Sequence, residues 1–132
     1  MKLEDIKEIL EFLDKMELTV QEQINELLYQ FEKESAEIKS KYDKPWCVTY
    51  GYNKGKTTQA TFETYDEGKE FARSTDGEYI IHNIPDVKID KLRFELREKL
   101  QEHEYNLKCI QHTKKLAKRW FLWLMEKQLE QN

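Results

Sequence analysis

Three side chains that could do chemistry lie within one ten-residue stretch: His103, Cys109 and His112. Cys109 and His112 stand three residues apart, so on a helix a thiol and an imidazole would share a face, as an activated nucleophile requires. No third group that could orient the imidazole is evident, and dedicated zinc sites show tighter paired spacing. We therefore expect neither a catalytic nor a metal site. Instead, Cys109 is expected to be a half-buried small hydrophobe and His103 a hydrogen-bonded core histidine.

Other signatures of enzymes are absent from the sequence. It has no Gly-rich phosphate loop, no G-x-S-x-G elbow and no H-E-x-x-H pair. Cys47 and Cys109 are too few and too far apart for a disulfide framework, which indicates free thiols in a reducing cytoplasm. No apolar run approaches the roughly 18 residues of a membrane span, and the N-terminus has no signal-peptide core. These features predict a cytoplasmic, non-enzymatic protein without a cofactor.

The first segment, residues 3–42, places apolar side chains three and four apart, which predicts an amphipathic helix. Its single apolar stripe is expected to run through Ile6, Ile9, Leu10, Leu13, Met16, Val20, Ile24, Leu27, Phe31, Ile38 and Tyr42. Between Val20 and Phe31 the spacing is that of a coiled coil. Thr19 to Glu22 has the form of a capping box, so the sequence fits either one helix or two helices joined near Leu18.

The middle segment, residues 44–84, changes to strand periodicity. Pro45 ends the first helix, since proline has no amide proton to donate. Apolar and polar residues alternate in Trp46–Tyr52 and again in Thr58–Phe62, which predicts two strands. Gly55 lies in the turn between them and is expected to take a positive φ, so the two strands form a β-hairpin.

A short helix and a third strand complete this segment. Thr64 has the position of a helix cap, and the helix is expected to run to Ser74. Gly68 in its middle costs about 1 kcal/mol relative to Ala, so we expect a close backbone approach there. Residues 78–84 then alternate as a strand, which gives a β-β-α-β module.

The last segment, residues 85–132, contains a second apolar stripe without Gly or Pro after Pro85, which predicts one very long helix. The stripe comprises Ile89, Leu92, Leu96, Leu100, His103, Leu107, Ile110, Ala117, Phe121 and Leu124. We expect a single α+β domain, residues 1–132, in which the two long helices fold back antiparallel and carry the module of residues 44–84 between them.

The charge is unevenly distributed along the chain. Residues 1–43 carry 6 Lys and 12 Asp or Glu, whereas residues 86–132 carry 11 basic and 8 acidic residues. The acidic and basic segments are therefore candidates for pairing with each other. If the acidic surface instead faces a basic partner, its residues are Glu4, Asp5, Glu8, Glu11, Asp14, Glu22 and Glu26.

The most unusual feature is the run from Trp120 to Met125, in which six apolar residues cover almost the whole circumference of a helix. Phe121 and Leu124 continue the stripe, whereas Trp120, Leu122 and Trp123 lie beside or away from it. Three arrangements fit: the three-stranded module covers them, a second copy covers them, or they form a hot spot for a protein partner.

Basic residues cluster just before this run. They are Lys108, Lys114, Lys115, Lys118 and Arg119. They suit phosphate contacts as well as pairing with the acidic helix, and Tyr50 and Tyr52 would supply stacking groups for bases. Nucleic-acid binding by this basic helix is the alternative function.

The segment from Trp46 to Arg73 also bears on this alternative. Its order of aromatic-ended strand, Asn-Lys-Gly turn, second strand and Thr-capped acidic helix loosely resembles the small arm-type DNA-binding domains of tyrosine integrases. The resemblance covers about a fifth of the chain. It departs from that pattern because the hairpin has few basic residues and a strand follows the helix.

The sequence therefore predicts a protein-interaction module. Small size, an acidic balance, long helices and no catalytic constellation are similar to accessory proteins of phages and mobile elements. That similarity implies an inhibitor that binds a host nucleoprotein machine such as a defence nuclease, using the acidic residues together with Trp120, Leu122 and Trp123. A third hypothesis is a homo-oligomer held by the helical stripe.

Overall fold

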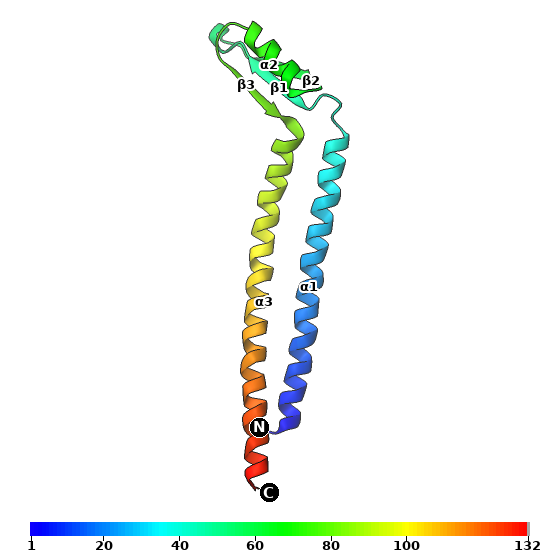
Figure 1. Cartoon of the computed structure of the whole chain (residues 1–132), viewed down its shortest axis with the longest axis vertical. Helices are drawn as coiled ribbons and strands as arrows, with labels where there is room; N and C mark the ends of the chain where they lie inside the picture. Colours follow the sequence, from blue (N-terminus) through cyan, green and yellow to red (C-terminus); the bar gives the residue numbers. More distant parts are fainter. Residues whose placement is uncertain (132) are drawn as a thin grey trace. The chain divides into compact units, whose positions relative to one another are not determined.

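The computed structural model describes residues 1–131 and confirms the predicted α+β class (Figure 1). Its elements are α1 (Leu3–Ser40), β1 (Trp46–Tyr50), a 3-10 helix (Tyr52–Lys54), β2 (Thr58–Phe62), α2 (Tyr65–Ser74), β3 (Tyr79–Asn83) and α3 (Ile84–Gln131). The chain divides into two compact units. Residues 1–29 and 96–131 form the first, called the helix pair, and residues 30–95 form the second, called the sheet module.

Helix α1 is one continuous helix, so the possible break near Leu18 does not occur. The hydroxyl of Thr19 donates to the carbonyl oxygen of Lys15 at 3.0 Å, one turn earlier in the same helix. Because this hydrogen bond satisfies the hydroxyl inside the helix, Thr19 does not act as a cap. The helix ends at Ser40, two residues before the predicted end.

In the helix pair the two segments run antiparallel (Figure 1). Their buried or half-buried residues recur at alternating steps of three and four. This is the seam of a coiled coil. On α1 it comprises Leu3, Ile6, Leu10, Leu13, Glu17, Val20, Ile24 and Leu27, and on α3 Leu96, Leu100, His103, Leu107, Ile110, Lys114, Ala117, Phe121 and Leu124. The prediction that Ile9 and Met16 belong to this line is wrong, because both side chains are exposed.

The sheet module confirms the β-β-α-β order. Its antiparallel strands lie in the order β2-β1-β3, and Val48 in the central strand lies opposite Ala60 and Ile81. Helix α2 packs on the face that carries Val48, which is fully buried. Aromatic rings fill this contact, since the ring of Phe71 lies 5.2 Å from that of Tyr50 and 5.0 Å from that of Phe62.

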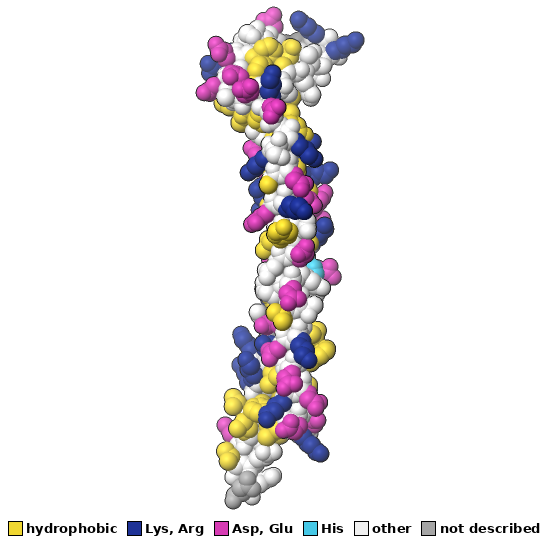
Figure 2. Space-filling model, turned by 90° about the vertical axis from the view of Figure 1, so that its right-hand side faces the viewer, with side chains coloured by type: hydrophobic (Ala, Val, Ile, Leu, Met, Phe, Trp, Pro, Cys, Tyr) yellow, Lys and Arg dark blue, Asp and Glu magenta, His cyan; other side chains and the backbone are white. Residues whose placement is uncertain are grey.

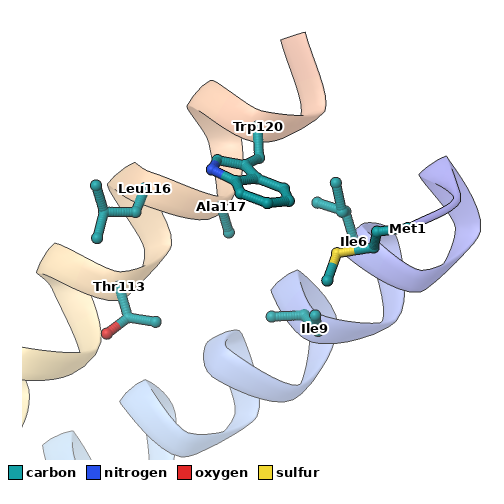
Figure 3. A pocket seen from close by; sticks show the side chains of 7 residues that line it. All are labelled: Met1, Ile6, Ile9, Thr113, Leu116, Ala117 and Trp120. Atoms are coloured by element: carbon teal, nitrogen blue, oxygen red, sulfur yellow. The ribbon is translucent and has the colours of Figure 1, made fainter. Parts of the chain in front are cut away.

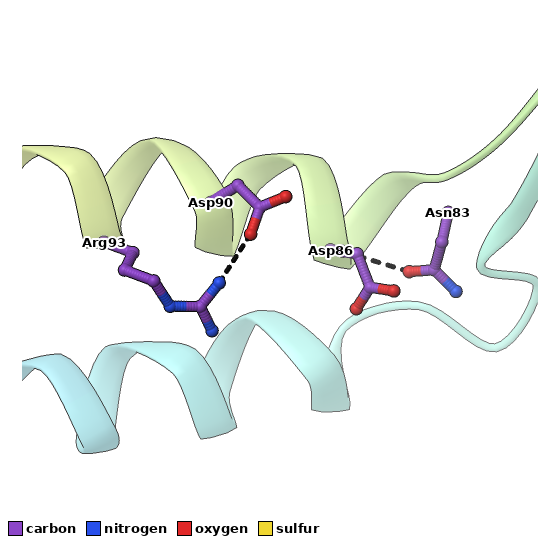
Figure 4. A network of polar contacts seen from close by, with 4 residues as sticks. All are labelled: Asn83, Asp86, Asp90 and Arg93. Atoms are coloured by element: carbon purple, nitrogen blue, oxygen red, sulfur yellow. Dashed lines mark hydrogen bonds and ion pairs between the residues drawn. The ribbon is translucent and has the colours of Figure 1, made fainter.

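Local hydrogen bonds cap the first turns of α2 and α3. The hydroxyl of Thr64 accepts from the amide of Glu67 at 3.2 Å, which confirms the predicted cap of α2. At the start of α3, the side-chain oxygen of Asn83 accepts from the amide of Asp86 at 3.0 Å, and one turn later Asp90 pairs with Arg93 at 2.6 Å (Figure 4).

The β-hairpin turn differs from the prediction in two respects. Gly55 has φ 76°, as expected, but Gly51 also has a positive φ of 86°. A Cβ at Gly51 would lie 2.8 Å from the carbonyl oxygen of Lys56, so this turn position excludes a side chain. Because β1 stops before Gly51, Tyr52 lies in the 3-10 helix rather than in the predicted strand.

Gly68 of α2 allows a direct test of the packing between this helix and the sheet. A Cβ there would lie 3.5 Å from Val48 Cγ2 and 3.6 Å from Phe62 Cδ2, which is ordinary van der Waals contact. We predict that Gly68→Ala raises the free energy of unfolding in urea by roughly 0.5–1 kcal/mol, because Ala restricts the unfolded chain. Gly68→Leu is the matched variant and should destabilise the protein through overpacking. Destabilisation by Ala would contradict this spacing.

The seam residue His103 allows a test of the packing between the two helices of the pair. It was expected to be hydrogen-bonded, but its buried Nδ1 has no hydrogen-bond partner among the described residues. We predict that His103→Leu raises the free energy of unfolding by about 1 kcal/mol, because the substitution removes an unpaired polar atom from an apolar seam. The control is His112→Leu, an exposed position on the same helix, which should change stability little. A loss of stability in His103→Leu would show that the ring has a necessary partner.

Candidate protein-interaction surface

The helix pair has one apolar side and one polar side. On the apolar side, an open groove of about 210 Å³ is lined by Met1, Ile6, Ile9, Thr113, Leu116, Ala117 and Trp120. Figure 3 shows Trp120 extending from α3 toward Ile6 of α1 and toward Met1, which precedes that helix. The groove therefore establishes that Ile9 of one helix and Leu116 and Trp120 of the other face the same side.

Helical spacing extends this side beyond the groove. Phe12 and Met16 follow Ile9 by three and seven residues, and Trp123 follows Trp120 by three, so they continue the same two lines. We define the apolar face as Ile9, Phe12, Met16, Leu116, Trp120 and Trp123. These side chains lie next to the seam rather than in it, because each follows or precedes a seam residue by one or two positions.

The large side chains of the apolar face are open to solvent. Phe12 is 62% exposed, Trp120 55% and Trp123 54%. Figure 2 shows hydrophobic side chains gathered on part of the helix pair, with charged side chains around them. Adjacent exposed aromatic and aliphatic side chains of this size are a feature of interaction sites, since a soluble monomer rarely leaves such a patch bare. The apolar face is therefore the candidate site.

The opposite side of the pair is polar. It carries two shallow depressions, lined by Asp14, Glu17, Leu18, Gln21 and Gln111 and by Glu17, Gln111, Lys114, Lys115 and Lys118. At its centre, Lys114 Nζ lies 2.6 Å from Asp14 Oδ1 and 3.6 Å from Glu17 Oε1. The side chain of Lys114 is only 17% exposed, and its hydrogen bond to Asp14 raises its pKa above the ordinary 10.5.

The structure shows which of the predicted basic residues form ion pairs within the chain. Lys114 pairs within the chain, as the acidic and basic segments allowed. Lys108, Lys115, Lys118 and Arg119 are exposed and form no ion pair in the part of the chain that the structure describes. Tyr50 belongs to the sheet module and packs edge-on against Phe71, whereas Tyr52 is exposed.

The predicted partner-binding residues do not form one surface. Trp120 and Trp123 lie on the apolar face, but Leu122, which is 59% exposed, lies two residues from Trp120 and so on nearly the opposite side of α3. The acidic residues are distributed around the outside of α1: Glu4, Glu8, Glu11, Asp14, Glu22 and Glu26. Glu4 lies 3.9 Å from Lys7, and Asp14 is held by Lys114.

Cys109 is exposed, which corrects the prediction of a half-buried side chain. Its interaction with the hydroxyl of Tyr105, one turn earlier, raises the pKa of that tyrosine. Within residues 1–131, no group of three or more His, Cys, Asp or Glu is placed to hold a metal ion. Over the same residues, no helix combines the length and apolar character that crossing a membrane requires.

Sequence reasoning missed four residues of the face: Ile9, Phe12, Met16 and Leu116. The signal was present, because residues 9, 12 and 16 repeat at helical spacing beside the line of Ile6 and Leu13. Ile9 and Met16 were assigned to the same stripe as Ile6 and Leu13, whereas Phe12 and Leu116 were assigned to no stripe, and only the pairing of the helices reveals the separate face. A scan against known protein families finds no match, and neither curated proteins nor solved structures give a match to the chain.

The Lys114 cluster gives a prediction about pH. Because Asp14 and Glu17 raise the pKa of Lys114 in the folded state, its contribution is fully present below the unfolded value of 10.5 and is lost as pH rises through the folded pKa. The difference in unfolding free energy between the parent and Lys114→Met should therefore be constant from neutral pH to about pH 10 and fall above it. Lys118→Met, at an exposed lysine without an ion pair, should show no such fall. A difference independent of pH would contradict the pairing.

Proposed function

We propose that this chain is a non-enzymatic protein-interaction module that binds a protein partner through the apolar face of its helix pair. The observation that carries the proposal is the exposure of Phe12, Trp120 and Trp123. Helical spacing from the groove residues Ile9 and Trp120 puts Phe12 and Trp123 on the side of the groove. Aromatic side chains dominate the energetics of protein interfaces, and a groove between two helices is a common receptor for an apolar helix. The partner would therefore present a helical apolar surface.

The finer expectation, inhibition of a host nucleoprotein machine such as a defence nuclease, stays a prediction. The alternative, nucleic-acid binding, is favoured by one observation. Lys108, Lys115 and Lys118 are exposed and unpaired among the described residues, and spacings of seven and three place them near one side of α3. The two functions use different sides of the helix pair, so variants can separate them.

The test is affinity capture of the tagged full chain from lysate, with and without nuclease, comparing Phe12→Lys and Trp123→Lys with the parent. We predict that a stoichiometric protein partner survives nuclease and is lost in both variants, because a charge enters the apolar contact. Leu122→Lys is the matched control, a similarly exposed apolar residue of α3 off the face, and should retain the partner.

The opposite pattern would support the alternative. Capture that disappears with nuclease, and is reduced by Lys115→Glu but not by Phe12→Lys, would contradict the proposal and assign the binding to the basic side. Circular dichroism of every variant establishes that the helices are retained.

A further inference from the structure

We infer that the partner on the apolar face is a second copy of this chain, so that two helix pairs form a four-helix bundle. This inference rests on the proposed function, because it identifies what the same face binds. A second apolar line on both helices, the charges beside the face and the exposed area of the face support this arrangement.

Apolar residues repeat beside the seam on both helices. Ile9, Phe12 and Met16 on α1, and Leu116, Trp120 and Trp123 on α3, follow spacings of three and four like the seam itself. A helix with two adjacent apolar lines is suited to contact two neighbours, as helices do in four-helix bundles. The helix pair supplies only one neighbour to each helix, so a second pair is needed to complete the contacts.

The two helical segments of the pair carry opposite net charges. Residues 1–29 carry eight acidic and three basic residues, a net −5, whereas residues 96–131 carry eight basic and five acidic residues, a net +3. A two-fold axis parallel to the helices places the acidic segment of each copy beside the basic segment of the other. Such an isologous contact needs opposite charges near one surface, and at the edge of the apolar face these are Glu8 on α1 and Arg119 on α3.

Two residues at the edge of the face show the arrangement in detail. Glu8 lies midway between the seam residues Ile6 and Leu10, so it points away from its own seam, and Arg119 does the same between Ala117 and Phe121. They cannot meet within one chain. Because the groove places Ile6 and Ala117 at the same level, Glu8 of one copy lies beside Arg119 of the other in the two-fold arrangement.

The exposed area of the apolar face sets how large an interface it can form. Phe12, Trp120 and Trp123 are each more than half exposed, so at about 200 Å² per aromatic side chain they alone supply on the order of 300 Å² per copy. The aliphatic side chains of Ile9, Met16 and Leu116 and the rim bring this toward the roughly 800 Å² per partner of a standard interface. The area of the face therefore lies near the lower limit of roughly 500 Å² per partner for a specific interface.

Sedimentation equilibrium of the full chain at high micromolar concentration tests the inference. The parent should be a dimer, and Phe12→Lys and Trp123→Lys should each raise the dissociation constant by roughly 30-fold or more, as loss of a hot-spot aromatic does. Leu122→Lys should remain dimeric, and circular dichroism should show that all variants keep their helices. A monomeric parent, or a dimer that both face variants leave intact, would overturn the inference.

Charge reversal tests the orientation. Glu8→Lys and Arg119→Glu should each weaken the dimer by roughly two- to fivefold, and the double variant should restore it, because an exposed ion pair contributes little but specifically. If the dissociation constant of the double variant is raised by the product of the two single effects, the two-fold arrangement is overturned.

The outcomes also separate this inference from the proposed function. A monomeric parent that captures a different protein through Phe12 and Trp123 rejects the second copy and retains the interaction module. A parent that neither dimerises nor captures a protein through these residues rejects both.

Discussion

Two antiparallel helices can bury only the side chains along the line where they touch, and this limit governs the helix pair. Ile6, Leu13 and Ile110 are buried on that line, whereas Phe12 and Trp120, one or a few residues away, remain in water. A larger core would need a third or fourth helix. The exposed aromatic side chains are therefore a direct consequence of folding a sequence with two apolar lines per helix into a structure with one seam.

The charged residues in the seam determine which side chains meet on the apolar face. Lys114 occupies a seam position and pairs with Asp14 and Glu17 across the helices. A shift of either helix along its neighbour would place this ammonium group opposite an apolar residue and leave it unpaired, at the cost of desolvation. The pair thus favours one stagger, as single polar residues do in other coiled coils. That stagger is the one that brings Ile9 level with the Leu116 turn of α3.

The sequence was sufficient for the elements but not for the surface. Three- and four-residue spacing predicted both long helices, and alternation together with the Thr64 cap predicted the sheet module, because these signals are local. Which residues lie in the seam depends instead on how the two helices pair in three dimensions. Glu17 and Lys114 lie in the seam, although charged residues seldom interrupt an apolar stripe. Ile9 and Met16 lie outside the seam, although their spacing extends the apolar stripe of α1. Which of Trp120, Leu122 and Trp123 share a side depended on where the other helix lies.

The central claim, that this chain completes its helix pair with a second copy, has a direct thermodynamic consequence. Binding that occurs only in the folded state stabilises that state in proportion to the logarithm of partner concentration. The decisive measurement is the thermal midpoint of α-helix unfolding across a wide range of protein concentration. Coupling of folding to self-association predicts a Tm that rises steadily with concentration in the parent and not in Phe12→Lys. A parent Tm independent of concentration would contradict the account.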